Sequence, residues 1–126
     1  MSVKTATISV TGRSGPGTRV AYVPGQERGI VVDTPGWFGW LEEAATTSFS
    51  YPVFDPGLGA IVRFLTVRKE RRQRGGAYWS AYWRAGQRVR RAYLGKSALV
   101  TQARLEALAE MVREHLHHEG AAEVRW

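Results

Sequence analysis

The chain has 126 residues, 44% of them hydrophobic, and a formal net charge of +7, which predicts one compact domain with a packed core. It contains no cysteine, which excludes a disulfide framework, Cys-ligated zinc and a thiol nucleophile. No apolar run approaches the roughly 18 residues that suggest a membrane span, and the first ten residues lack the features of a secretory signal. We therefore expect a cytoplasmic protein that does not contact a membrane.

The positive charge is concentrated in one part of the chain. Residues 63–96 contain eleven basic residues and a single acid, Glu70, whereas the remainder contains seven basic residues and ten acids. Within residues 65–96, five Tyr and Trp residues are interleaved with the basic ones. A local concentration of Arg among aromatic side chains is typical of a surface that binds the phosphates and bases of a nucleic acid.

Short strands are expected at the N-terminus. Residues 3–10 alternate between apolar and polar types, and residues 19–23 and 29–33 read as two further strands around a turn. The glycine-rich segment 12–18 is expected to be a turn or loop. Residues 1–33 are therefore interpreted as N-terminal strands or an arm, and the sequence leaves open whether they fold on the rest of the domain.

A short helix is predicted to follow this region. Thr34 is a suitable N-cap and Pro35 a suitable first helical residue. The helix is expected to end near Ala45, and its apolar residues share one face: Trp37, Trp40 and Leu41. We expect these aromatic residues to pack on the sheet, with docking of a protein partner as the alternative.

Four strands forming two hairpins are predicted next. Residues 47–55 alternate as a strand, which Pro52 places at a sheet edge, and a turn at 55–59 joins them to a strand at 60–72. Residues 77–84 and 87–94 are expected to pair around a turn at Ala85-Gly86, with Arg84 opposite Gln87.

The alternation of this second hairpin assigns its side chains to two faces. One face is predicted to carry Tyr78, Ser80, Tyr82, Arg84, Gln87, Val89, Arg91 and Tyr93. The other is predicted to carry Trp79, Ala81, Trp83, Arg88, Arg90, Ala92 and Leu94. We expect Trp79 and Trp83 to pack beneath a helix. For Tyr78 and Tyr82, contact with a ligand and packing under the N-terminal half remain alternatives.

A final amphipathic helix is predicted from an N-cap at Thr101 to about His117. Its apolar stripe consists of Leu105, Leu108, Ala109, Val112 and Leu116. The expected fold class is α+β: an antiparallel sheet of three or more strands backed by this helix, with a short Trp-rich helix and N-terminal strands. Residues 34–118 would form the nucleic-acid-binding domain and residues 119–126 a C-terminal tail.

Residues 63–116 resemble the small DNA-binding domain at the N-terminus of tyrosine recombinases, the AP2-like or arm-type integrase domain. The matching segments are RFLTVRKERRQRGG, AYWSAYW, QRVRRAYLG and TQARLEALAEMV. Residues 33–112 also resemble a module found beside some bacterial LuxR-type regulators, through WFGWLE, RKERRQRGGAYW and YLGK. The integrase-type family implies a three-stranded antiparallel sheet, backed by one helix, whose open face lies in the major groove of DNA.

The basic patch and the resemblance together give the candidate nucleic-acid contacts, while residues 1–60 have no counterpart in the compact integrase domain. The candidates are Arg68, Lys69, Arg71, Arg72, Arg74, Tyr78, Ser80, Tyr82, Arg84, Arg88, Arg91 and Lys96. No recombinase catalytic domain, phosphate-binding loop, catalytic triad or metal-ligand pattern is recognisable, so we expect neither catalysis nor a cofactor or metal.

The expected role is therefore binding of duplex DNA, in a transcription regulator or an accessory protein of a mobile element. Binding of RNA or single-stranded DNA on the aromatic sheet is one alternative. A protein-interaction domain, or a homodimer, is the other.

Overall fold

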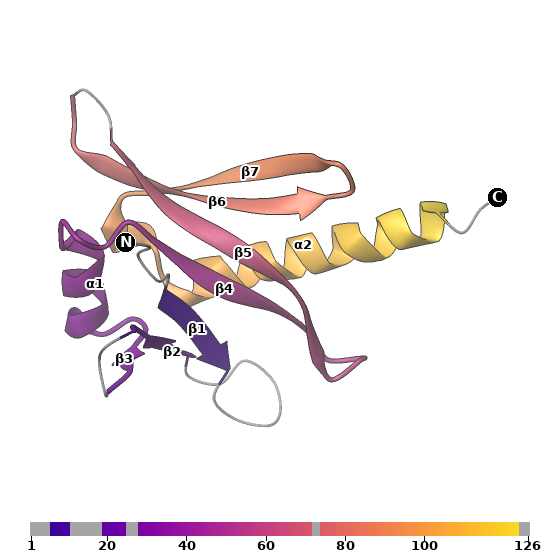
Figure 1. Cartoon of the computed structure of the whole chain (residues 1–126), viewed down its shortest axis with the longest axis horizontal. Helices are drawn as coiled ribbons and strands as arrows, with labels where there is room; N and C mark the ends of the chain where they lie inside the picture. The colour runs from indigo at the N-terminus through magenta and orange to yellow at the C-terminus, as the bar shows by residue number, and fades with distance from the viewer. Residues whose placement is uncertain (1–5, 11–18, 25–27, 72–73, 124–126) are drawn as a thin grey trace.

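The protein forms a seven-stranded sheet with a long helix across one face, seen in a computed structural model of which residues 6–10, 19–24, 28–71 and 74–123 are described (Figure 1). The strand order is β3-β2-β1-β4-β5-β6-β7, and every pairing is antiparallel except that of β1 with β4. This arrangement confirms the predicted α+β class. The strands are β1 (Ala6–Val10), β2 (Arg19–Tyr22), β3 (Ile30–Val31), β4 (Ser48–Asp55), β5 (Ala60–Arg71), β6 (Ala77–Ala85) and β7 (Arg88–Gly95).

The short helix α1 (Pro35–Glu42) begins as predicted. The Thr34 hydroxyl accepts a hydrogen bond from the backbone N–H of Trp37, and proline occupies the first turn. The helix ends at Glu42, three residues before the expected Ala45. Its buried residues are the three predicted ones: Trp37, Trp40 and Leu41.

The long helix α2 (Gln102–Glu123) follows a single 3₁₀ turn, η1 (Ser97–Leu99). Thr101 caps its start, because its hydroxyl accepts a hydrogen bond from the backbone N–H of Arg104 at 3.4 Å. The carboxylate of Asp33 accepts a second one, from the N–H of Gln102 at 2.9 Å. The expected end near His117 is wrong, because α2 continues to Glu123.

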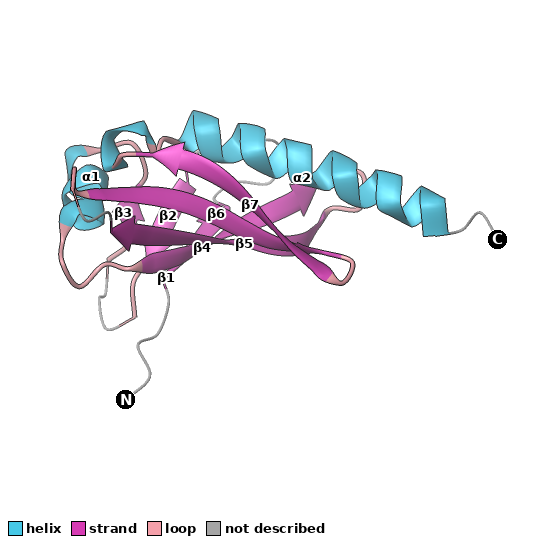
Figure 2. Ribbon diagram, turned by 90° about the horizontal axis from the view of Figure 1, so that it is seen from above, coloured by secondary structure: helices cyan, strands magenta, loops and turns pink. Residues whose placement is uncertain are grey.

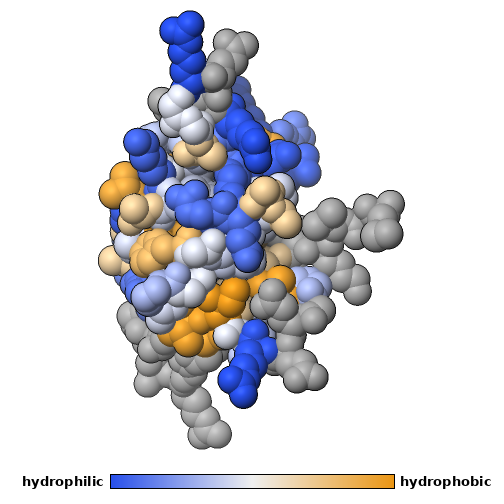
Figure 3. All heavy atoms as spheres, turned by 90° about the vertical axis from the view of Figure 1, so that its left-hand side faces the viewer, coloured by the Kyte–Doolittle hydropathy of each residue, from blue (hydrophilic) through white to orange (hydrophobic). Residues whose placement is uncertain are grey.

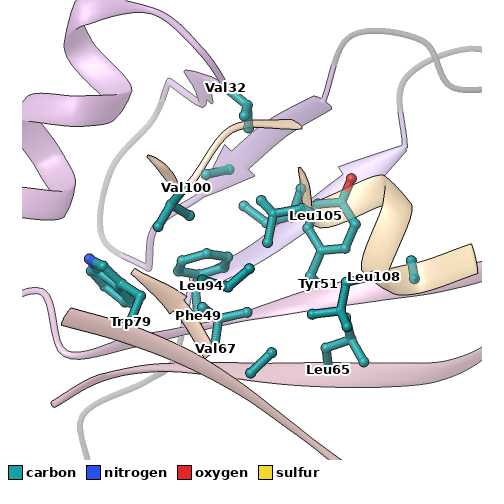
Figure 4. Close-up of a cluster of buried hydrophobic side chains, with 14 of the residues drawn as sticks. Val32, Phe49, Tyr51, Leu65, Val67, Trp79, Leu94, Val100, Leu105 and Leu108 are labelled. Carbon is teal, nitrogen blue, oxygen red and sulfur yellow. The ribbon is translucent and has the colours of Figure 1, made fainter. Parts of the chain in front are cut away.

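The hydrophobic core lies between the sheet and α2 (Figure 4). The sheet contributes fully buried side chains: Phe49, Tyr51, Leu65 and Val67. The predicted apolar stripe of α2 packs against them, with Leu105, Leu108, Ala109 and Val112 buried and Leu116 partly buried. Seen from above, α2 runs along one side of the sheet (Figure 2). The helix therefore backs the sheet, as its amphipathic pattern predicts.

The tryptophans form an aromatic cluster at the end of the core next to α1. Phe49 lies 5.2 Å from Trp37 and 5.5 Å from Trp79, measured between ring centroids. Both indole N–H groups are satisfied inside the protein: Trp37 donates to the carbonyl of Val100 and Trp79 to the hydroxyl of Ser97, each at 2.9 Å. Full burial and internal hydrogen bonds make these residues core, as expected.

The N-terminal strands extend the same sheet, which answers a question that the sequence left open. Arg19 on β2 is 3% exposed and forms an ion pair with Glu106 of α2, to which its Nε donates at 2.6 Å. The Tyr51 hydroxyl donates to the same carboxylate at 2.5 Å, and burial is the main cause that raises the pKa of Tyr51. This buried cluster fixes β2 to β4 and α2.

Two local expectations are wrong. Pro52 does not mark an edge strand, because β4 lies between β1 and β5. The register of β4 with β1 ends at Ser50, so Pro52 lies beyond that ladder and its missing N–H breaks no bond in it. The β6–β7 loop is Gly86-Gln87 rather than Ala85-Gly86, so Ala85 pairs with Arg88.

Within the described ranges, no helix is long and apolar enough to cross a membrane.

Candidate nucleic-acid interface

The β5–β7 part of the sheet has one face against the core and one face turned to solvent. The β6–β7 register pairs Arg84 with Val89, Tyr82 with Arg91 and Ser80 with Tyr93. In the predicted register Arg84 pairs with Gln87, so each β6 residue in fact pairs with a residue two positions further along β7. A shift of two positions leaves every side chain on its predicted face. Trp79, Ala81, Trp83 and Leu94 face the core and are buried, as expected for residues packed under a helix.

We call the solvent-facing side chains of β5–β7 the open face. It consists of Phe64, Thr66, Arg68, Glu70, Tyr78, Ser80, Tyr82, Arg84, Val89, Arg91 and Tyr93. In Figures 1 and 2, α2 lies on the opposite side of these strands, and no other described element crosses the open face. Tyr93 is 54% exposed. Tyr78 and Tyr82 are half-buried. They lie on β6, and β1–β3 lie beyond β4 in the strand order, so these tyrosines are not packed beneath those strands.

Glu70 is the centre of a hydrogen-bonded cluster on this face. Its Oε1 accepts a hydrogen bond from the Tyr82 hydroxyl, and its Oε2 accepts one from Nη2 of Arg91 at 2.7 Å. The same Nη2 lies 3.2 Å from the Ser80 hydroxyl and 3.5 Å from that of Tyr78. Side chains from β6 and β7 thus converge on one carboxylate of β5.

The cluster is charged but internally neutralised. The hydrogen bond from Tyr82 is the main cause that holds the pKa of Glu70 below its ordinary value, and the same bond raises the pKa of Tyr82. Glu70 is therefore ionised at neutral pH and offsets the charge of Arg91. The positive charge that remains on the open face belongs to Arg68 and Arg84, both of which are exposed.

Aromatic and apolar side chains complete the open face. The guanidinium carbons of Arg68 and Arg91 each lie 5.9 Å from the centre of the Tyr82 ring, within the range of cation–π attraction. The rings of Tyr78 and Tyr93 are 5.5 Å apart. Phe64, two residues before Thr66 and hence on the same face of β5, is 47% exposed. Flat aromatic surfaces and guanidinium groups are thus accessible together.

Three candidate contacts lie away from the open face or beneath it. Lys69 points to the core side, where its Nζ donates to the carbonyl of Glu43 at 2.9 Å, and burial lowers its pKa. Arg88 is exposed, but it lies on the core side of β7. Ser80 lies on the open face, yet it is fully buried and bonded to Arg91, so it is not accessible to a ligand.

The remaining basic candidates surround the open face. Arg71 ends β5, Arg74 lies in the β5–β6 turn and Lys96 follows β7, and all three are exposed. Arg72 lies outside the described residues. Figure 3 views the molecule from the end at which this turn projects, and strongly hydrophilic side chains gather at the turn, at the top of the view.

Reasoning from the sequence missed Glu70 and Phe64 as members of the site. The signal for Glu70 was its position as the single acid among the basic residues of 63–96, two residues from Arg68 and hence on the same face of the strand. Among the described residues, no three or more His, Cys, Asp or Glu side chains are grouped so that they could hold a metal ion.

No protein-family model, curated protein or solved structure matches the chain. The resemblance to integrase-type domains therefore stays a prediction.

Proposed function

We propose that the protein binds duplex DNA, without catalysing a reaction, by placing the open face in the major groove. The observation that supports this proposal is a sheet face, uncovered by any described element, on which Arg68 and Arg84 are exposed and the guanidinium of Arg68 lies beside the Tyr82 ring. Exposed arginines neutralise phosphates, and arginine forms bidentate hydrogen bonds with guanine.

The combined width of β5, β6 and β7 is compatible with placing the open face in the major groove. Neighbouring strands are about 4.8 Å apart, so β5, β6 and β7 span roughly 10 Å between their outer axes, against a major groove about 12 Å wide. Twist of about 20–25° per strand accumulates over the six steps from β7 to β3. β3 is thereby turned by roughly 120–150° from β7 and need not follow the groove.

The resemblance suggests the biological setting. Integrase-type domains bind DNA within recombination systems, and the second similar module accompanies transcription regulators. We therefore propose a cytoplasmic regulator or an accessory protein of a mobile element, whose part in the process is to bind DNA.

A binding titration tests this proposal. Fluorescence anisotropy would be measured with one labelled sequence as duplex DNA, single-stranded DNA and single-stranded RNA, at about 50 and 200 mM salt. We expect the duplex to bind most tightly, with an affinity that falls steeply as salt rises. An affinity for duplex that does not change with salt would contradict the proposal and favour a protein-interaction domain.

The exposed rings favour single-stranded nucleic acid as the second candidate. Tyr93 is 54% and Phe64 47% exposed, and unpaired bases stack on such rings with a gain of about 1–3 kcal/mol each. Tighter binding of a single strand than of duplex in direct competition, together with a loss on Tyr93→Ala, would establish this alternative.

A further inference from the structure

Strand β7 forms one edge of the sheet and is much longer than the strand at the opposite edge (Figure 1). It has eight residues, whereas β3 has two. Within the described ranges, β7 pairs with β6, and no strand lies along its outer side. At its end, Nη1 of Arg104 on α2 donates to the carbonyl of Leu94, so residues 88–92 are the accessible part. An edge of this kind can pair with another extended segment.

The hairpin loop determines which backbone groups of β7 point outward. Because the loop has two residues, the residues that flank it, Ala85 and Arg88, form a hydrogen-bonded pair. Hydrogen-bonded and non-hydrogen-bonded pairs alternate along an antiparallel ladder. Val89 and Arg91 therefore direct their N–H and C=O groups away from β6. Among the described residues, neither takes part in a backbone hydrogen bond outside the sheet.

The side chains along this edge are positively charged on one side of the sheet and apolar on the other. Arg88 and Arg90 lie on the core side of β7, are exposed and, among the described residues, form no ion pair. On the open face, Val89 is 66% and Tyr93 54% exposed. A segment paired with β7 would thus meet arginines on one side and an apolar surface on the other.

The same arginines oppose pairing of β7 with a second copy of the chain. Arg88, Arg90 and Arg91 take three of the first four positions of the strand. Glu70 offsets the charge of Arg91, but the other two would lie close to the arginines of the partner strand, which is destabilising. Charged edge strands protect sheets from self-association in this way. An acidic strand would be attracted instead.

We propose that β7 binds an extended acidic segment of a partner protein, which adds to the sheet as an eighth strand. Its backbone would bond to the outward groups of Val89 and Arg91. Its acids would lie beside Arg88 and Arg90, and because side chains alternate between faces, apolar residues would lie between the acids and cover Val89. A nucleic acid suits this edge less well, since outward carbonyl oxygens accept hydrogen bonds and repel phosphate. Binding of such a segment does not depend on the proposed function and can be measured without DNA.

Synthetic peptides test this proposal. The probe has about eight residues, in which Glu alternates with Val, and its affinity is measured by fluorescence anisotropy. One control peptide has Lys in place of Glu, and another keeps the side chains of the probe but has methylated backbone N–H groups. We expect the probe to bind at least about tenfold more tightly than either control, because each control lacks one of the two interactions. Equal binding of the probe and the methylated peptide would overturn the proposal.

Amide hydrogen exchange locates the bound peptide. In the free protein the N–H groups of Val89 and Arg91 should exchange rapidly, whereas those of Arg88 and Arg90 bond to β6 and should exchange slowly. At a probe concentration about 100 times its Kd, exchange at Val89 and Arg91 should slow by about 100-fold. Unchanged exchange at both residues would contradict pairing with β7. Protection of these amides by duplex DNA but not by the probe would assign the edge to a nucleic acid and overturn the proposal.

Two variants separate the backbone of β7 from its charge. Val89→Pro removes an outward N–H but no hydrogen bond to β6, so it should weaken probe binding at least about tenfold while the circular dichroism spectrum stays that of wild type. Arg88→Glu with Arg90→Glu should reverse the preference, so that the Lys peptide binds more tightly than the probe. Arg28→Glu, exposed before β3, is the control for net charge and should keep the wild-type preference. If the reversed pair still prefers the acidic peptide, the proposal is wrong.

Discussion

The two uncompensated arginines of the open face provide the sharpest prediction for DNA binding. We predict that replacing Arg68 and Arg84 together by Gln weakens binding and lowers its salt dependence. Both side chains are exposed on the open face, and no acid on that face faces them except Glu70, whose oxygens are bonded to Tyr82 and Arg91. Gln preserves much of the side-chain length and polarity, so the change isolates charge.

The size of the effect follows from counterion release. Each phosphate contact adds about 0.9 to the slope of log affinity against log salt, so two lost contacts lower the slope by about 1.8. Between about 50 and 200 mM salt, the wild-type affinity should therefore fall roughly tenfold more than that of the variant. Each replaced contact should weaken binding to different sequences by similar amounts, because phosphates are common to all of them.

The chain offers a control with the same change of charge. Arg88 and Arg90 lie on the neighbouring strand β7 and are exposed, but they point to the opposite side of the sheet. Fluorescence anisotropy at four or more salt concentrations would give the slope for wild type and both double variants. If Arg88→Gln with Arg90→Gln lowers the slope as much as the open-face pair does, the choice of face is wrong.

Three further predictions concern stability, each measured by chemical denaturation. Glu106→Ala should lower the free energy of unfolding by about 3–5 kcal/mol, because it leaves the buried Arg19 without its partner. The double variant Arg19→Met with Glu106→Leu should lose much less stability, and equal losses in the two variants would contradict this prediction. Asp33→Ala should lower the free energy of unfolding by about 1 kcal/mol or more, because it removes a cap from α2. It also places alanine at a φ of 70°, which Asn and Asp tolerate better, so Asp33→Asn should lose little stability. The pKa of Glu70 is lower in the folded than in the unfolded protein, so its carboxylate stabilises the fold above the unfolded pKa of about 4.3. The stability advantage of wild type over Glu70→Gln should therefore disappear as the pH falls through the pKa of the folded protein. A stability advantage that persists at pH 2 would refute this prediction.

The strands of the second half of the chain were predictable because alternation of residue types reports directly on a half-buried strand. The bounds of β4 to β7 differ from the predicted ones by one residue at most. The misplaced loop between β6 and β7 reflects turn chemistry: Gly86 has a positive φ of 62°, as the first loop residue of a type II′ turn requires. That preference assigns the loop to Gly86-Gln87.

The parts that sequence reasoning left open depend on contacts between distant residues. The parallel pairing of β1 with β4 joins Ala6 to Phe49, and nothing local in either segment indicates it. The same holds for the cluster around Glu70. Its partners Tyr82 and Arg91 are distributed over two other strands, so their convergence requires the register of the whole β5–β7 sheet.

The most direct test of the open face is an NMR titration that follows arginine side chains. The Nε–H resonances of a ¹⁵N-labelled sample would be recorded while unlabelled duplex DNA is added at low salt. We predict large shifts for Arg68, Arg84 and Arg91, with Arg88, Arg90 and the indole N–H of Trp79 almost unchanged. Shifts concentrated on Arg88 and Arg90, with the open-face arginines unaffected, would contradict binding through this face.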